Sequence, residues 1–167
     1  MGKKEINGLS QSIFESYSSQ LLQVSKNIDQ DIQSAAELII NNSGKVVVCG
    51  LGKSGLIGQK IVATLCSTGT RSVYMHAAEA IHGDLGIYNP GDPTILISKS
   101  GNTEELVRLV PILKEFQSPL IAIVGNMDSF IAKNSDIVLN GTVEKEIDPL
   151  GVCLLYTSDA ADDMQCV

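Results

Sequence analysis

The sequence has no run of basic residues, no paired-cysteine motif and no long apolar stretch. Its 12 Lys and Arg are outnumbered by 19 Asp and Glu, which gives a net charge of −7. A surface that binds a nucleic-acid duplex needs clustered Lys and Arg, so we expect no nucleic-acid partner. A phosphate ligand remains possible, because a few backbone N–H groups and one Lys can bind it locally against the overall charge.

The cysteines exclude two further classes of site. Cys49, Cys66, Cys153 and Cys166 form no C-x-x-C pair, so a zinc site or thioredoxin-type chemistry has no support. We expect Cys49 and Cys66 to be buried free thiols, and no metal or cofactor. The sequence shows no N-terminal signal pattern and no apolar run of about 20 residues. It therefore predicts a cytoplasmic protein with no membrane partner.

The apolar pattern predicts one α/β domain behind a long N-terminal helix. After an expected loose tail at residues 1–9, apolar residues recur every three or four positions over 10–42, the period of one kinked helix or of two helices. Short apolar runs typical of buried strands then alternate with helical segments, which predicts a parallel sheet with helices on both faces. The predicted strands are 45–50, 72–75, 94–98, 120–124 and 136–139, and the predicted helices are 54–67, 102–116 and 129–133; residues 76–84 read as a polar segment.

The loop after the first predicted strand has the chemistry of an anion site. In Gly50-Leu-Gly-Lys-Ser-Gly55, glycines let the backbone approach a ligand, the next helix presents N–H groups, and Lys53 adds a positive charge. A P-loop is excluded because Val47 stands where its first Gly is needed. The spacing matches G-x-G-x-x-G, but the acidic residue that a dinucleotide site needs is replaced by Met75-His76. A tight turn with an exposed Lys is the remaining structural alternative.

The loop after the third predicted strand, Ser98-Lys-Ser-Gly-Asn-Thr103, opens a helix in the same way. Its three hydroxyls lie where the helix has unpaired N–H groups, so they can cap the helix or bind phosphate oxygens. An ordinary capped helix is the alternative. Ligands bind outside the carboxyl ends of strands in such sheets, so two such loops favour one phosphate site.

Four motifs in order resemble the arabinose-5-phosphate isomerase branch of the sugar isomerase (SIS) domain family. Residues 98–105 resemble the S-x-S-G-x-T-x-E signature of SIS domains, and residues 52–55 the opening loop of that branch. Residues 76–86 resemble H-x-x-E-A-x-H-G-D-L-G, and residues 145–151 resemble K-E-x-x-P-L-G. The resemblance covers roughly residues 45–151 and implies a three-layer αβα sandwich around a five-stranded parallel sheet.

The resemblance also implies an activity and a set of site residues. The activity is interconversion of D-arabinose 5-phosphate and D-ribulose 5-phosphate, which supplies a precursor of Kdo for lipopolysaccharide or capsules, and the family is tetrameric. Since this reaction moves a proton between C1 and C2 through an enediol, it needs a base and acids at O1 and O2; His82 and Glu105 both remain candidates for the base. The implied catalytic residues are Lys53, His82, Glu105 and Glu146, and the implied phosphate-binding residues are Gly52, Ser54, Ser98, Ser100, Gly101, Asn102 and Thr103.

The likeness ends after Gly151. The family continues with a Ser/Thr-rich stretch and a helix that carries a further His, whereas His76 and His82 are the only two His here. We therefore divide the chain into an N-terminal helical segment (1–44), an incomplete SIS domain (45–151) and a non-native tail (152–167), and expect little isomerase activity from the chain as written. Two alternatives are a non-catalytic sugar-phosphate sensor and a SIS isomerase for another sugar phosphate.

Overall fold

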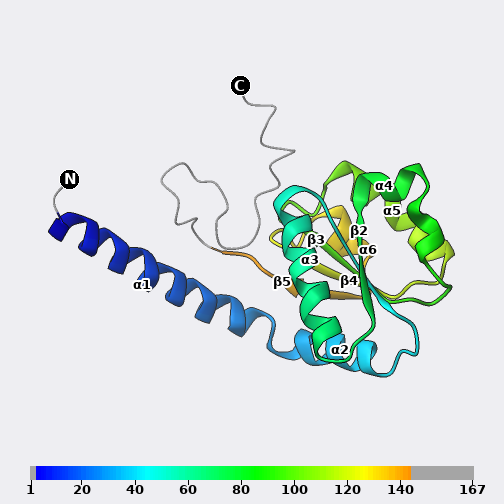
Figure 1. Ribbon diagram of the computed structural model, residues 1–167, viewed down its shortest axis with the longest axis horizontal. Coiled ribbons are helices and arrows are strands. Elements are labelled where there is room, and N and C mark those ends of the chain that lie inside the picture. The colour runs from blue at the N-terminus through cyan, green and yellow to red at the C-terminus, as the bar shows by residue number, and fades with distance from the viewer. Residues whose placement is uncertain (1–2, 144–167) are drawn as a thin grey trace.

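The computed structural model describes residues 3–143 (Figure 1). Six α-helices, one short 3₁₀ helix and five strands alternate along this part of the chain. The helices are α1 (Lys3–Asn27), α2 (Asp29–Ile40), α3 (Gly52–Ser67), α4 (Ala77–His82), η1 (Asp84–Ile87), α5 (Glu104–Glu115) and α6 (Phe130–Asn134), and the strands are β1 (Val46–Gly50), β2 (Ser72–His76), β3 (Thr94–Ser98), β4 (Leu120–Val124) and β5 (Ile137–Asn140).

The five strands form one parallel sheet in the order β2-β1-β3-β4-β5. The sheet runs from β1 outward to β2 in one direction and from β3 through β4 to β5 in the other. The order therefore reverses between β1 and β3, and in open α/β sheets ligands bind at such a point, outside the carboxyl ends of the strands.

Helices cover both faces of this sheet, as the sequence predicts (Figure 1). On one face Val46, Val48, Ile95 and Ile97 form a core that α2 and α3 cover. Alternate residues of the same strands point to the other face, where α4, α5 and α6 pack. β1 and β3 are buried along their whole length because both of their faces are covered. The three-layer αβα sandwich is confirmed.

The N-terminal segment consists of two helices that meet at Ile28. α2 lies against the sheet and contributes buried Ala35 to the core, whereas α1 extends away from the sandwich (Figure 1). The helix begins at Lys3, so the expectation of a loose tail over residues 1–9 is wrong for 3–9. None of the described helices is both long and apolar enough to cross a membrane.

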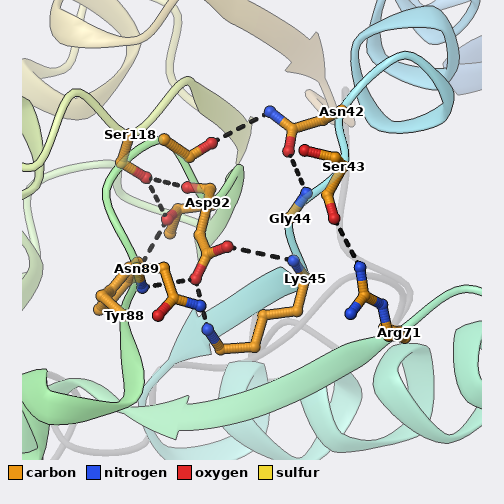
Figure 2. Close-up of polar contacts among 11 residues, drawn as sticks. Asn42, Ser43, Gly44, Lys45, Arg71, Tyr88, Asn89, Asp92 and Ser118 are labelled. Carbon is orange, nitrogen blue, oxygen red and sulfur yellow. Dashed lines mark hydrogen bonds and ion pairs between the residues drawn. The ribbon is translucent and has the colours of Figure 1, made fainter.

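A buried polar network ties the amino ends of the central strands together (Figure 2). Asp92, which is 1% exposed, pairs with the Lys45 ammonium and accepts hydrogen bonds from the backbone N–H groups of Asn89 (2.7 Å) and Lys45 (3.1 Å). Ser118 donates to the Asp92 carbonyl and bonds Thr94 at 2.7 Å. This network fixes the end of the sheet opposite the predicted ligand loops.

Candidate functional site

The two glycine- and serine-rich loops lie side by side at the carboxyl edge of the sheet. β1 and β3 are adjacent and parallel, with Gly50 opposite Ile97 in the register. The loops that leave these strands therefore emerge at the same edge, at the point where the strand order reverses. The geometry agrees with the prediction that both loops serve one site.

The hydroxyls of the loop after β3 hold it in one conformation. Ser98, which is fully buried, bonds the hydroxyl of Thr103 at 2.8 Å and accepts a hydrogen bond from the N–H of Gly101 at 3.0 Å. Ser100 is exposed and accepts from the N–H of Asn102 at 3.2 Å. Thr103 occupies the N-cap position of α5, but its side chain makes no cap hydrogen bond to the helix. The buried side chains of Ser98 and Thr103 thus hold the loop in shape, whereas the side chain of Ser100 faces solvent.

Glycine is the residue type that fits at position 101, the tip of this loop. The φ of Gly101 is +66°, in the left-handed region that side chains disfavour. A β-carbon there would overlap the side chain of Ser129, which comes from the loop before α6. Glycine therefore allows the loop after β3 to lie directly on the neighbouring loop.

Hydrogen bonds join the loop after β3 to the segment that follows β4, which is itself tied to the chain after β5. The Asn102 side-chain oxygen accepts from the N–H of Phe130 at 2.8 Å, and the Gly101 carbonyl accepts from Ile131 at 3.0 Å. The Thr142 hydroxyl, from the chain after β5, donates to the Gly125 carbonyl at 2.9 Å. The predicted phosphate loop is thus supported by its neighbours before any ligand binds.

The loop after β1 turns sharply into α3. Gly52 has a φ of +53°, and Ser54 is fully buried. The Tyr74 hydroxyl donates to the Gly50 carbonyl at 2.9 Å, and a β-carbon on Gly55 would collide with that hydroxyl. Burial raises the pKa of Tyr74 to about 12, so the hydroxyl keeps its proton. Tyr74 therefore fixes the start of the loop that carries Lys53.

The two helix N-termini differ in their charge. The first turn of α3 contains exposed Lys53 and no acidic residue, so its N–H groups and dipole favour an anion. The first turn of α5 contains Glu104 and Glu105. Glu104 pairs with Arg108 one turn later, whereas Glu105 is half-buried. Positive potential is thus concentrated at the loop after β1, with a carboxylate beside the loop after β3.

His82 and His76 flank the short helix α4. His82 is the last residue of α4, is exposed, and lies on a helix that packs against α5, the helix of Glu105. His76 ends β2 opposite Gly50, and its Nδ1 atom is buried without a hydrogen-bond partner among the described residues. It lines a pocket of about 440 Å³ with Asp84 and other residues of the following turn. His76 belongs to the motif at 76–86 but was not among the predicted site residues.

Eight of the eleven predicted site residues gather at the two loops, whereas His82 is the last residue of α4 and Glu105 is in the first turn of α5. Gly52, Lys53 and Ser54 follow β1, as predicted; Ser98 is the last residue of β3, and Ser100, Gly101, Asn102 and Thr103 follow it. Glu146, its motif at 145–151 and the tail at 152–167 lie outside the described residues. Among the described residues, no group of three or more His, Cys, Asp or Glu side chains is arranged to hold a metal ion.

A known family matches the same part of the chain. The sequence model of the SIS domain matches residues 39–160, which is more than half of the chain. The chain belongs to the SIS domain family. The arabinose 5-phosphate isomerase KpsF of Escherichia coli O6:H1 is 49% identical over 133 residues, which are 79% of this chain and 41% of KpsF. The predicted resemblance to arabinose-5-phosphate isomerases is confirmed.

Two solved structures share the fold over nearly the whole chain. The structure of c3406 from E. coli CFT073 in complex with arabinose 5-phosphate is 35% identical, with a TM-score of 0.82, and the match covers 92% of this chain and 81% of c3406. A candidate sugar-phosphate isomerase from Listeria monocytogenes is 34% identical with a TM-score of 0.85, covering 90% and 80% of the two chains. The chain spans about two fifths of the length of the curated relatives it matches.

Proposed function

We propose that the protein to which this chain belongs is an aldose–ketose isomerase that interconverts D-arabinose 5-phosphate and D-ribulose 5-phosphate, as part of the supply of Kdo. The main support for the proposal is that two loops suited to binding an anion, one after β1 and one after β3, lie next to each other where the strand order reverses. The name of KpsF and the sugar phosphate bound to c3406 support arabinose 5-phosphate as the substrate.

The phosphate would sit between the loops after β1 and β3. Lys53 and the first N–H groups of α3 supply positive charge from one side. Exposed Ser100 and Asn102 supply polar groups from the other side, while buried Ser98 and Thr103 hold the loop in shape. The sequence analysis predicts that all four of these side chains bind the phosphate. Because Ser98 and Thr103 are buried, we propose that these two support the loop and do not contact the phosphate.

The proton transfer would use groups from α4 and α5. Isomerisation removes a proton from C2 of the aldose and returns it to C1 through an enediol, while O1 and O2 exchange a proton. His82 and Glu105 come from helices that pack together, and either can act as the base. Lys53 would stabilise negative charge that develops on the sugar oxygens. Glu146 and His76 are further candidates for proton transfer to the oxygens.

We further propose that the protein is a cytoplasmic homo-oligomer, with a tetramer as the expected form. Free thiols at Cys49 and Cys66 are compatible with a reducing compartment. Burial raises the pKa of Cys49 to about 12, which leaves that thiol unreactive.

The experiment is an isomerase assay on the protein at the length of its relatives, paired with His82→Ala. We expect conversion of arabinose 5-phosphate to ribulose 5-phosphate, and loss of turnover with retained sugar-phosphate binding in His82→Ala, an exposed position where folding should persist. Binding without turnover in the unaltered protein would instead identify a sugar-phosphate sensor. Turnover of another sugar phosphate alone would reassign the substrate.

A further inference from the structure

A polar hollow of about 360 Å³ lies at the amino edge of the sheet. The side chains that line it are those of Ser43, Lys45, Cys66, Arg71, Ser72 and Asn89, and we call it the amino-edge hollow. It lies where β1 and β2 begin, whereas the loops of the proposed substrate site leave the opposite ends of the strands. Because a strand of five residues spans about 16 Å, the hollow is separate from that site.

The lining of the amino-edge hollow is rich in hydrogen-bond donors. Arg71 uses one Nη atom to donate to the Ser43 carbonyl (Figure 2), and a guanidinium has about five N–H donors in all. The planar fork of these donors fits the oxygens of a phosphate or carboxylate group. Ser43, Ser72 and Asn89 add hydroxyl and amide groups that can also donate.

Arg71 gives the hollow a positive charge that no carboxylate balances within the described part of the chain. The ion pairs found there are Lys45–Asp92, Arg108–Glu104 and Lys133–Asp128. Asp92 offsets the charge of Lys45, so Lys45 supplies donors and little net charge. None of the lining residues is acidic. A donor-rich hollow with one unbalanced cation favours an anion, even in a chain whose net charge is −7.

A purely structural role is the alternative for Arg71. α2 ends at Ile40 and α3 at Ser67, and carbonyl groups at the C-terminus of a helix favour a nearby cation. The Ser43 carbonyl, which accepts from Arg71, follows α2 by only three residues. That hydrogen bond occupies a single donor, however, and the Arg71 side chain remains exposed. Its other N–H groups are therefore accessible to a ligand.

We propose that the amino-edge hollow is a second anion site, which binds a small phosphate or carboxylate compound through Arg71 with Lys45, Ser43 and Asn89 as supporting donors. Its volume of about 360 Å³ suits a small metabolite. The proposal does not depend on the proposed isomerase reaction, because the two sites lie at opposite edges of the sheet.

Alkylation of Cys66, which is exposed and lines the hollow, reports on anions bound there. Cys153 and Cys166 are first replaced by Ser, and buried Cys49, whose pKa is raised to about 12, does not compete. The rate is measured with iodoacetate, an anion, and with iodoacetamide, a neutral reagent of similar size. Because both reagents attack the same sulfur, the ratio of the two rates cancels changes in the reactivity of the sulfur and measures attraction of the anion.

Arg71→Gln should lower the ratio of the iodoacetate rate to the iodoacetamide rate at least roughly fivefold. The matched control is Arg108→Gln, since Arg108 is exposed on α5 and pairs with Glu104; it should leave the ratio unchanged. Both substitutions are at exposed positions, and denaturation checks that the variants fold. An unchanged ratio in folded Arg71→Gln would overturn the proposal and leave Arg71 with its structural role.

Protection by added anions distinguishes the two kinds of ligand. Inorganic phosphate or malonate at about 10 mM, with ionic strength held constant by chloride, should slow the reaction of Cys66 with iodoacetamide about threefold. The anion that protects assigns the site to phosphates or to carboxylates, and failure of both would overturn the proposal.

Lys53→Gln separates this site from the proposed substrate site. Protection of Cys66 should persist in this variant, because Lys53 follows β1 at the opposite edge of the sheet. Loss of protection in Lys53→Gln would assign the effect to the substrate loops and would also overturn the proposal. Phosphate affinity at those loops is measured independently, so failure of one proposal does not imply failure of the other.

Discussion

The α-carbon of Gly101 lies so close to the side chain of Ser129 that no β-carbon fits between them. The contact joins the loop after β3 to the loop before α6, and the Gly101 carbonyl accepts a hydrogen bond from Ile131 beside it. The conformation of the proposed phosphate loop is therefore set by its neighbour as well as by its own sequence.

Replacing Gly101 by Ala should destabilise the protein and weaken phosphate binding together. The left-handed φ of +66° and the overlap with Ser129 should cost about 3 kcal/mol of unfolding free energy, measured by chemical denaturation. Gly69→Ala is the matched control, because Gly69 has a φ of +92° with open space around it. The control should lose about 1 kcal/mol and keep its phosphate affinity. Equal losses in the two variants would show that the contact with Ser129 is unimportant.

Replacing Ser98 should mainly reduce the stability of the protein, whereas replacing Ser100 should mainly reduce its affinity for phosphate. Ser98→Ala removes the buried acceptor of the Gly101 N–H and the hydrogen bond to the Thr103 hydroxyl, at a cost of about 2 kcal/mol of stability. Ser100→Ala, at an exposed position, should change stability by less than about 0.5 kcal/mol and lower phosphate affinity by about tenfold. Denaturation and calorimetric titration of both variants measure the two effects. The reverse pattern would place the phosphate on Ser98.

Lys53 should contribute to anion binding and little to stability. It is exposed in the first turn of α3, so Lys53→Gln should leave the denaturation midpoint unchanged and lower phosphate affinity by about tenfold. The matched control is Lys60→Gln, an exposed lysine two turns further along the same helix. A comparable loss in both variants would indicate general electrostatics instead of a local contact.

Asp92, which lies at the amino ends of the strands, should make the free energy of unfolding depend on pH. Burial opposes ionisation of its carboxyl, but hydrogen bonds from the Lys45 ammonium and from backbone N–H groups outweigh it, so its pKa lies below the usual value. The stability it confers is therefore complete above about pH 4 and is lost as pH falls through the lowered folded-state pKa. Asp92→Asn should cost about 2 kcal/mol at pH 7 and progressively less in acid.

The control for Asp92 is Asp128→Asn. Asp128 pairs with Lys133 at 3.3 Å, but its side chain is 94% exposed, so the change should be within about 0.5 kcal/mol at every pH. If the stability difference between the unaltered protein and Asp92→Asn were independent of pH, the ion pair would not be its source.

The five strands could be predicted from the sequence because each is a short, mostly apolar run between turn or helical segments. Val46–Gly50 and Thr94–Ser98 are buried on both faces, which removes the alternation of polar residues and leaves a clear apolar run. A kink or break in the N-terminal helical stretch was also predictable, since an apolar pattern of that length exceeds one ordinary helix, but its position at Ile28 was not.

The features that sequence reasoning missed depend on length or on tertiary contact. α4 has six residues, too few to show a helical period. Cys66 was expected to be buried but is exposed, because α3 turns that side toward solvent. The bond between Asn102 and Phe130 joins residues that are distant in sequence, and it arises only because β3 and β4 are neighbours. His76 was not among the predicted site residues, and the sheet pairs it with Gly50 of β1.

The convergence of the two loops on one phosphate is tested most directly by an amide NMR titration of the chain with arabinose 5-phosphate. We predict that the amide signals of residues 52–54 and 98–103 shift together and fit one dissociation constant, and that inorganic phosphate shifts the same signals. Shifts confined to one loop, or two different constants for the two loops, would contradict a shared site.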